Sequence, residues 1–320
     1  MLSRLLRRLL LGQVLAGAVL GWFIARQTGA GLWLVALTVL LLPLATLKLS
    51  ILTTAIKSRA PGANALWWRS LVGEILTALR VYLLQLPWAT APPVIQPATG
   101  APLRLPVVLV HGYLCNHRVW DAMASRLRRA GHPVLGVDLE PLFTSIDRYA
   151  PLIEQAVAQL CRQTGAPKVA LIGHSMGGLA IRAWMRSHGS GRVATAITLG
   201  TPHVGTQIAH LTPTDNGEQM RWQSTWLQEL AASETASTRS LMRIALTPQD
   251  NIVYPQREQV LEDVPVTVFD GLGHLELCFD KNVIAWVLQQ LEDPAPAPPM
   301  SRMKQAPVRA DLHLAQAPPS

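Results

Sequence analysis

Charged side chains are scarce in this chain, and acidic ones are almost missing from its first 90 residues. Only 15% of the 320 residues are charged, 49% are hydrophobic, and the net charge is +8. Residues 1–90 contain nine Lys and Arg but a single acid, Glu74, whereas the rest of the chain carries 19 basic and 19 acidic side chains. A nucleic-acid-binding protein would carry its basic excess on the folded domain. The sequence therefore argues against nucleic acid as a partner and favours a membrane.

Cysteine is also rare, and no pattern of metal ligands is present. The three cysteines, Cys115, Cys161 and Cys278, cannot all pair in disulfides, which suits reduced thiols in the cytoplasm. No cluster of His, Asp and Glu has the spacing of a metal site, so we expect neither a metal nor a cofactor. Cys115 remains an alternative nucleophile to the serine described below.

Two long apolar runs dominate the N-terminal region. The first, Leu9 to Ala25, has 17 residues without a charge, and the second, Gln27 to Leu47, has 21. Each is close to the ~20 apolar residues that span a bilayer core. We therefore expect a transmembrane hairpin in residues 1–60, with helices at about 9–25 and 31–47. Basic residues precede the first run, follow the second and are fewer in the turn, which predicts that both ends are cytoplasmic: Arg4, Arg7 and Arg8, then Arg26 alone, then Lys48, Lys57 and Arg59.

Two other interpretations of these runs were considered. A basic start followed by an apolar stretch and Ala16-Gly17-Ala18 resembles a cleavable secretory signal. The second apolar run so soon afterwards argues against a signal peptide. Buried core helices are the other alternative, and the length and lack of charge of the runs argue against it.

Residues 61–102 predict an amphipathic helix and a linker. Apolar side chains recur at helical spacing from Leu66 to Trp88, which is typical of a helix that lies on a membrane surface or packs against the following domain. The Pro-rich segment 91–102 then marks a domain boundary. At the other end of the chain, residues 293–320 are rich in Pro, Ala and Gln and are expected to be a disordered tail.

Between residues 103 and 292, short β-branched runs alternate with helical patterns. Such alternation predicts an α/β domain with a mostly parallel sheet and helices on both faces. In such a sheet, function is expected at the carboxyl ends of the strands. Strands are expected at 106–110, 133–137, 168–172, 193–199, 241–246 and 264–269, with helices at 119–130, 145–164, 179–188 and 282–291.

Gly173-His174-Ser175-Met176-Gly177 stands between an expected strand and an expected helix. A G-x-S-x-G sequence in that position forms a tight turn that presents the serine oxygen clear of the backbone. A Gly-rich phosphate-binding turn is the alternative, but no Lys follows at the spacing of a P-loop. Ser175 is therefore the candidate nucleophile.

A serine nucleophile needs a base and an acid that orients it, expected here in the chain order Ser, acid, His. His274 follows the last expected strand and precedes the last helix, so we assign it as the base. Asp250 follows the preceding strand and is the candidate acid, with Asp270 as its competitor. His111, His174 and His203 also lie near the site, and a structural hydrogen-bonding role is the simpler interpretation for them.

The remaining site residues are assigned by position. A developing oxyanion needs N–H donors, which we assign to the amides of Met176, directly after the nucleophile, and of Tyr113, in the loop after the first strand. Leu114 is a candidate for the acyl pocket. Segment 204–240 does not follow the alternation of strand and helix patterns, so we expect it to form a cap over the active site. Trp222 and Trp226 of this cap would contact an apolar substrate. An ordinary surface helix is the alternative for that segment.

Five motifs occur in the order of a known family: Val-His-Gly-Tyr at 110–113, Gly-His-Ser-Met-Gly-Gly at 173–178, Leu-Gly-Thr-Pro-His at 199–203, Asp-Asn-Ile-Val-Tyr-Pro at 250–255 and Gly-His-Leu at 273–275. Together they resemble the α/β-hydrolase fold, particularly bacterial lipases and esterases. The resemblance covers residues 103–292 and implies a Ser-His-Asp hydrolase. The N-terminal hairpin departs from the secreted lipases, which carry a cleavable signal.

These observations lead to one principal hypothesis. The sequence predicts a membrane-anchored serine hydrolase of carboxylic esters that acts through an acyl-enzyme on an apolar ester or lipid. An acyltransferase with the same three residues and a non-catalytic membrane scaffold are the alternatives. The expected location is a bacterial inner membrane with the catalytic domain in the cytoplasm, and the periplasmic face is the alternative. The sequence makes no prediction of oligomeric state.

Overall fold

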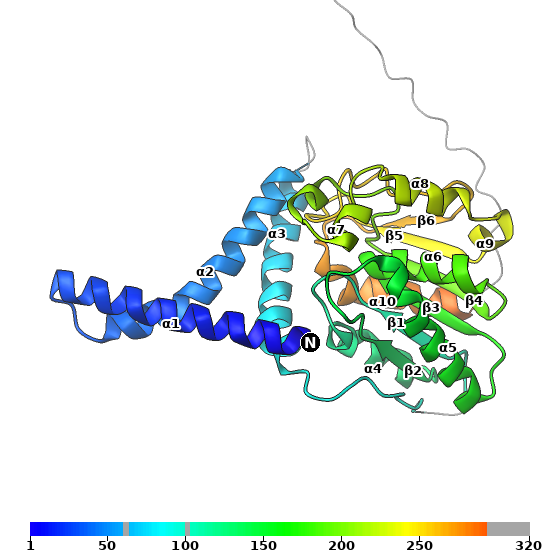
Figure 1. Cartoon of the computed structure of the whole chain (residues 1–320), viewed down its shortest axis with the longest axis horizontal. Helices are drawn as coiled ribbons and strands as arrows, with labels where there is room; N and C mark the ends of the chain where they lie inside the picture. The colour runs from blue at the N-terminus through cyan, green and yellow to red at the C-terminus, as the bar shows by residue number, and fades with distance from the viewer. Residues whose placement is uncertain (60–63, 100–102, 293–320) are drawn as a thin grey trace, which may run out of the picture.

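The structure is a computed structural model that describes residues 1–59, 64–99 and 103–292. The predicted disordered tail, 293–320, lies outside the described residues. Figure 1 shows a sheet-containing domain from which a long helical hairpin projects. The hairpin tip points away from the domain, whereas the N-terminus lies beside it.

A single parallel sheet of six strands forms the centre of the domain, in the order β2-β1-β3-β4-β5-β6. Every strand falls within one of the expected segments, apart from a two-residue extension of β3, so the predicted fold class is confirmed. The mainly β-branched and apolar composition of these segments suits a sheet that is covered on both faces. The strands are β1 (Val107–Val110), β2 (Val134–Val137), β3 (Val169–His174), β4 (Val193–Leu199), β5 (Met242–Leu246) and β6 (Val266–Val268).

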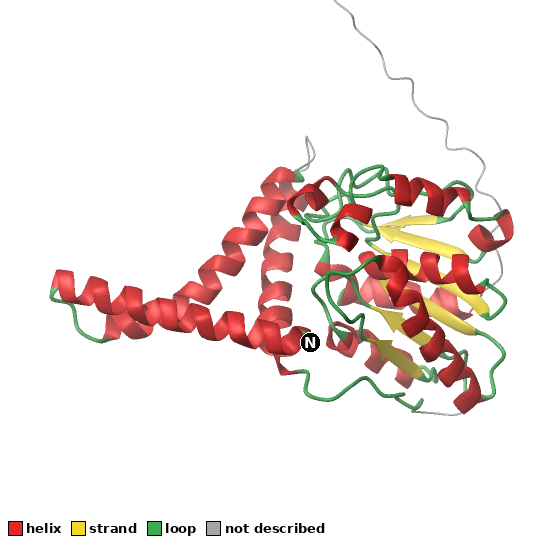
Figure 2. Ribbon diagram, in the orientation of Figure 1, coloured by secondary structure: helices red, strands yellow, loops and turns green. Residues whose placement is uncertain are grey.

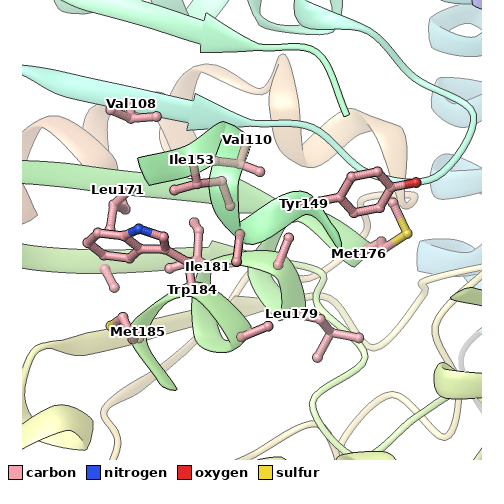
Figure 3. Packing of buried hydrophobic residues seen from close by; sticks show 14 of the residues in the cluster. Val108, Val110, Tyr149, Ile153, Leu171, Met176, Leu179, Ile181, Trp184 and Met185 are labelled. Atoms are coloured by element: carbon pink, nitrogen blue, oxygen red, sulfur yellow. The ribbon is translucent and has the colours of Figure 1, made fainter. Parts of the chain in front are cut away.

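Alternate strand residues point to two separate hydrophobic clusters, one on each face of the sheet. Val108 and Leu171 pack with α5 (Ala150–Thr164) and α6 (Met176–His188), as Figure 3 shows for buried Ile153 and Trp184. Val107 and Leu109 belong to the other cluster, with α4 (Asp121–Arg129) and α10 (Lys281–Glu292). This is the period-two alternation that a strand imposes on its side chains. Figure 2 shows the layered arrangement of helices and strands that results.

Segment 204–240 forms four short helices rather than a strand–helix unit. They are η5 (Gln207–Leu211), α7 (Asp215–Gln219), α8 (Thr225–Ala232) and α9 (Ala236–Ser240). Side-chain oxygens of Thr214, Ser224 and Thr235 accept hydrogen bonds from backbone amides at the starts of α7, α8 and α9. Such N-caps explain why a sequence with little helical periodicity still forms helices here.

The projecting hairpin consists of α1 (Leu2–Thr28) and α2 (Trp33–Lys57), which both extend beyond the predicted boundaries. The two helices meet at the small residues Gly17 and Gly21. Thr38 Oγ1 donates to the Gly17 carbonyl oxygen at 2.7 Å, and a Cβ added at Gly21 would lie only 2.7 Å from Val35 Cα. Small residues four apart that allow close backbone approach are typical of packed membrane helices.

The amphipathic segment forms α3 (Asn64–Leu79), followed by a π-helical turn, η1 (Arg80–Gln85), and a 3-10 turn, η2 (Leu86–Trp88). It packs against the sheet-containing domain, which was one of the two arrangements expected. Trp67 and Leu71 are buried on its inner face, while Trp68 and Leu76 are exposed on the other. Because α3 also contacts α2, it connects the base of the hairpin to the domain.

Candidate active site

Ser175 lies at the carboxyl end of β3, immediately before the first residue of α6. Its backbone has φ 55° and ψ −130°, a conformation that non-glycine residues rarely adopt. Two hydrogen bonds hold it there: the Ser175 amide donates to the Leu199 carbonyl oxygen at 2.9 Å, and Thr201 Oγ1 donates to the Ser175 carbonyl oxygen at 3.0 Å. The expected strand–turn–helix context of Ser175 is therefore present.

Glycines allow neighbouring backbone to approach this turn closely. A Cβ added at Gly177 would lie 2.1 Å from the Val110 carbonyl oxygen, so only glycine fits between α6 and the end of β1. A Cβ added at Gly112 would lie 2.7 Å from Ser175 Cβ and 3.3 Å from Ser175 Oγ. The loop after β1 therefore lies directly against the Ser175 hydroxyl.

Asp250 and His274 form a buried pair in the loops that follow β5 and β6. His274 Nδ1 lies 2.8 Å from Asp250 Oδ2, and the two residues are 4% and 2% exposed. The other carboxylate oxygen, Oδ1, accepts the amides of Ile252 and Val253 at 2.8 and 2.7 Å, which fixes the side chain. Burial alone would lower the pKa of His274, but the charge and hydrogen bond of Asp250 outweigh burial and raise it.

The other three histidines near the site make structural hydrogen bonds. His174 Nε2 donates to the His274 carbonyl oxygen at 3.0 Å, and burial with the nearby His274 lowers the pKa of His174 far below its ordinary value. His111 Nε2 accepts the Leu139 amide at 3.0 Å, so Nδ1 carries the proton and donates to the Gly112 carbonyl oxygen at 2.8 Å. His203 contacts Thr198 Oγ1 at 2.9 Å.

A cavity of about 370 Å³ brings four of the predicted site residues together. Ser175 and His274 line it, as do Tyr113 and Leu114 from the loop after β1. Met176 lines a smaller adjacent pocket with Gly112 and Tyr113, so both residues assigned to the oxyanion site lie beside the nucleophile. Segment 204–240 contributes Ile208 and Thr212 to the larger cavity.

Trp222 and Trp226, expected to contact substrate, do not line this cavity. The Trp226 indole N–H instead donates to Asp147 Oδ2 at 2.8 Å. The Trp222 backbone lies against Gly205. Neither tryptophan is therefore part of the wall of this cavity.

Glu74 is a site residue that the sequence analysis did not assign. It extends from α3 into the cavity, is 3% exposed, and accepts the Leu275 amide at 2.9 and 3.1 Å. That amide directly follows His274. Burial raises the pKa of Glu74 to about 8, even though His274 and the Leu275 amide act in the opposite direction. The available signal was that Glu74 is the single acid in the first 90 residues.

Cys115 also lines the cavity, yet its chemistry does not suit a nucleophile. Burial raises the pKa of its thiol to about 12, so the reactive thiolate is not populated near neutral pH. All three cysteines are free. Within the part of the chain that the structure describes, no group of three or more His, Cys, Asp or Glu side chains could hold a metal ion.

Comparison with known proteins supports the fold assignment. Residues 106–241 match the family described as the alpha/beta hydrolase fold. Together with the six-stranded parallel sheet, this match shows that the chain has the α/β-hydrolase fold.

More particularly, the chain is a distant homologue of triacylglycerol lipases. It is 36% identical over 130 residues to one from Burkholderia plantarii, covering 38% of this chain and 36% of that one. It is 38% identical over 120 residues to one from Pseudarthrobacter phenanthrenivorans, covering 35% and 37%. The chain therefore spans about a third of the length of the curated relatives it matches.

Solved structures show the same fold. The mature lipase of Bacillus licheniformis superposes with a TM-score of 0.53 at 18% identity, over 61% of this chain and 95% of that one. Lipase B of Aspergillus fumigatus gives a TM-score of 0.53 at 16% identity, over 61% and 54%.

Proposed function

We propose that this protein is a membrane-anchored carboxylic-ester hydrolase that uses Ser175 as nucleophile, His274 as base and Asp250 as the orienting acid. One observation carries the proposal: a serine in a strained strand-to-helix turn lines the same cavity as an imidazole that is hydrogen-bonded to a buried carboxylate. Nucleophile, base and orienting group together are the requirement for acyl transfer through a covalent intermediate.

The hydrogen-bond pattern supports a specific role for each residue of the site. Because His274 Nδ1 faces Asp250 Oδ2, the neutral ring carries its proton on Nδ1 and its lone pair on Nε2. Nε2 takes the Ser175 hydroxyl proton as Oγ attacks the ester carbonyl carbon. The amides of Tyr113 and Met176 stabilise the resulting oxyanion. The imidazolium then protonates the leaving alcohol, which leaves the acyl group on Ser175 Oγ. In the second step, Nε2 takes a proton from water as the water oxygen attacks the acyl carbon. The acyl–Oγ bond then breaks, the imidazolium returns the proton to Ser175 Oγ, and the carboxylic acid is released.

The cavity supports an apolar substrate. Its walls include Leu114, Ile208 and Ile252. The similar proteins described above are triacylglycerol lipases, which is consistent with a lipid ester. We therefore propose a long-chain acyl ester as the substrate class.

The hairpin supports anchorage in a bacterial inner membrane. Helices α1 and α2 are each long and apolar enough to cross a membrane. Large apolar side chains such as Leu15, Val19 and Leu40 are exposed along them, which is unfavourable in water and favourable in lipid. Helix α1 begins, and α2 ends, at the sheet-containing domain, close to the basic clusters (Figure 1). By the positive-inside rule, we therefore propose that the domain lies in the cytoplasm.

The test of the enzymatic function uses the full chain purified in detergent. We expect hydrolysis of p-nitrophenyl esters, and loss of at least ~10³-fold in kcat for Ser175→Ala, because removal of a catalytic nucleophile leaves only binding and the oxyanion site. Ser125→Ala, on α4 and away from the cavity, is the matched control and should retain wild-type activity. Equal activity of Ser175→Ala and wild type would contradict the proposal, and faster acyl transfer to an added alcohol than to water would favour an acyltransferase.

A further inference from the structure

One wall of the active-site cavity is built by the second hairpin helix. Leu47, Ser50, Ile51 and Thr54 of α2 all line the cavity that contains Ser175 and His274. These positions follow the i, i+3, i+4, i+7 spacing of a single helix face. A continuous stripe of α2 therefore faces the nucleophile, although α2 is far from the sheet in sequence.

Specific contacts hold this stripe against the catalytic loops. Asn251, the residue after Asp250, donates its side-chain N–H to Thr54 Oγ1 at 3.1 Å. Gln256 Nε2 donates to the carbonyl oxygen of Ser58, the residue directly after α2, at 2.8 Å. From α3, the Trp67 indole N–H donates to the Ala55 carbonyl oxygen at 3.1 Å. Three hydrogen bonds from two directions fix the last two turns of α2 beside the Asp250 loop.

The α2 stripe, formed by Leu47, Ser50, Ile51 and Thr54, runs from the catalytic loops toward the hairpin tip. Thr54 lies at the end bound to the Asp250 loop, whereas Leu47 lies seven residues nearer the hairpin tip, about 10 Å farther along the helix axis. Beyond Leu47, α2 continues outward with exposed apolar side chains, including Leu40 and Leu41. The α2 stripe thus runs from the catalytic loops toward the part of α2 that lipid would surround.

We propose that the substrate is a membrane-resident long-chain acyl ester, drawn from the same bilayer that holds the hairpin, and that the α2 stripe forms the wall along which its acyl chain lies. This inference rests on the proposed ester hydrolysis. A cavity of about 370 Å³ is near the lower end for small-ligand sites, so it holds the ester and the adjoining part of one chain, while the rest of the lipid stays in the bilayer. The acyl chain of the ester then reaches Ser175 without being exposed to water. Such exposure would cost free energy in proportion to the length of the acyl chain.

The experiment compares two esters with the same leaving group. The full chain is reconstituted into vesicles of a diether phosphatidylcholine, which contains no carboxylic ester. p-Nitrophenyl palmitate is placed in the bilayer, and p-nitrophenyl butyrate is supplied in the water. Leu47→Trp narrows the bilayer end of the stripe. Leu49→Trp, on the opposite face of α2 and 65% exposed, is the matched control.

We expect Leu47→Trp to lower the ratio of palmitate to butyrate hydrolysis at least tenfold, and Leu49→Trp to leave that ratio unchanged. Wild-type protein should hydrolyse palmitate in its own vesicles and not in a separate vesicle population. An unchanged ratio in Leu47→Trp, or equal hydrolysis of the ester in both vesicle populations, would overturn the inference while leaving ester hydrolysis itself intact. Absence of activity toward both esters in the wild type would instead refute the proposed function.

Discussion

The buried carboxyl of Glu74 makes stability depend on pH in a way that one substitution should remove. Its side chain is 3% exposed and accepts the Leu275 amide, and burial raises its pKa from 4.5 to about 8. Glu74→Gln keeps the shape and an oxygen that can accept the same amide, but it cannot ionise. Glu74→Gln therefore tests the effect of Glu74 ionisation on stability separately from the effect of its shape.

The sign and size follow from proton linkage. Between about pH 4.5 and 8, the folded protein holds a proton on Glu74 that the unfolded chain has released. The stability from this group is therefore fully present below about pH 4.5 and is lost as the pH rises to about 8. A difference of about 3.5 pKa units, at 1.36 kcal/mol each, sets a ceiling of about 5 kcal/mol on that loss. Glu74→Gln should not lose stability in this way as the pH rises.

The assay is thermal unfolding of the full chain in detergent, followed by intrinsic tryptophan fluorescence across this pH range. We expect Tm of Glu74→Gln relative to wild type to rise by about 10 °C from pH 4.5 to 8.5, since ~1 kcal/mol shifts Tm of a domain of this size by about 2 to 4 °C. Glu258→Gln, at an exposed position, should follow the wild type at every pH. If Glu74→Gln and wild type showed parallel pH dependence, the carboxyl would not be buried and protonated as described.

Two further substitutions test the site itself. Asp250→Asn should reduce kcat by about 10³ to 10⁴-fold, because the imidazole loses the partner that fixes its tautomer. In the wild type, kcat/KM should fall as pH drops below the raised pKa of His274, since the base must be neutral. In the residual activity of Asp250→Asn, this acidic limb of the pH profile should move to lower pH. An acidic limb at the same pH in both proteins would show that another group titrates. Gly112→Ala should reduce kcat/KM by about 10²-fold, because the new Cβ would lie 2.7 Å from Ser175 Cβ. Gly191→Ala, which meets nothing within 4 Å, is its control, and equal rates for both variants would contradict the placement of the loop.

The sheet and the turn at Ser175 could be predicted because their signals are local. Segments such as 107–110 and 193–199 are short and β-branched, and the Gly-x-Ser-x-Gly sequence carries its own backbone requirement. Chain order favoured Asp250 over Asp270 as the candidate acid. The structure places Asp250 beside His274, whereas Asp270 lines a separate pocket.

The contribution of α2 and α3 could not be predicted, because it depends on contacts between distant parts of the chain. Glu74 contacts the amide of Leu275, 201 residues away, and Thr54 contacts Asn251, 197 residues away. Nothing in the local sequence specifies either pair. Trp226 shows a second limit. Its place in the expected cap segment suggested substrate contact, but its indole N–H donates to Asp147, and no local signal in the sequence specifies that partner.

The most direct test of the central claim is to identify the residue that a fluorophosphonate modifies in the full chain. We expect one adduct, on the peptide that contains Ser175, absent in Ser175→Ala and retained in Ser125→Ala. We also expect that protonating His274 at low pH slows labelling, since the neutral imidazole activates the hydroxyl. No adduct on the folded wild type, or an adduct on Cys115 or another serine, would contradict the assignment of Ser175 as nucleophile.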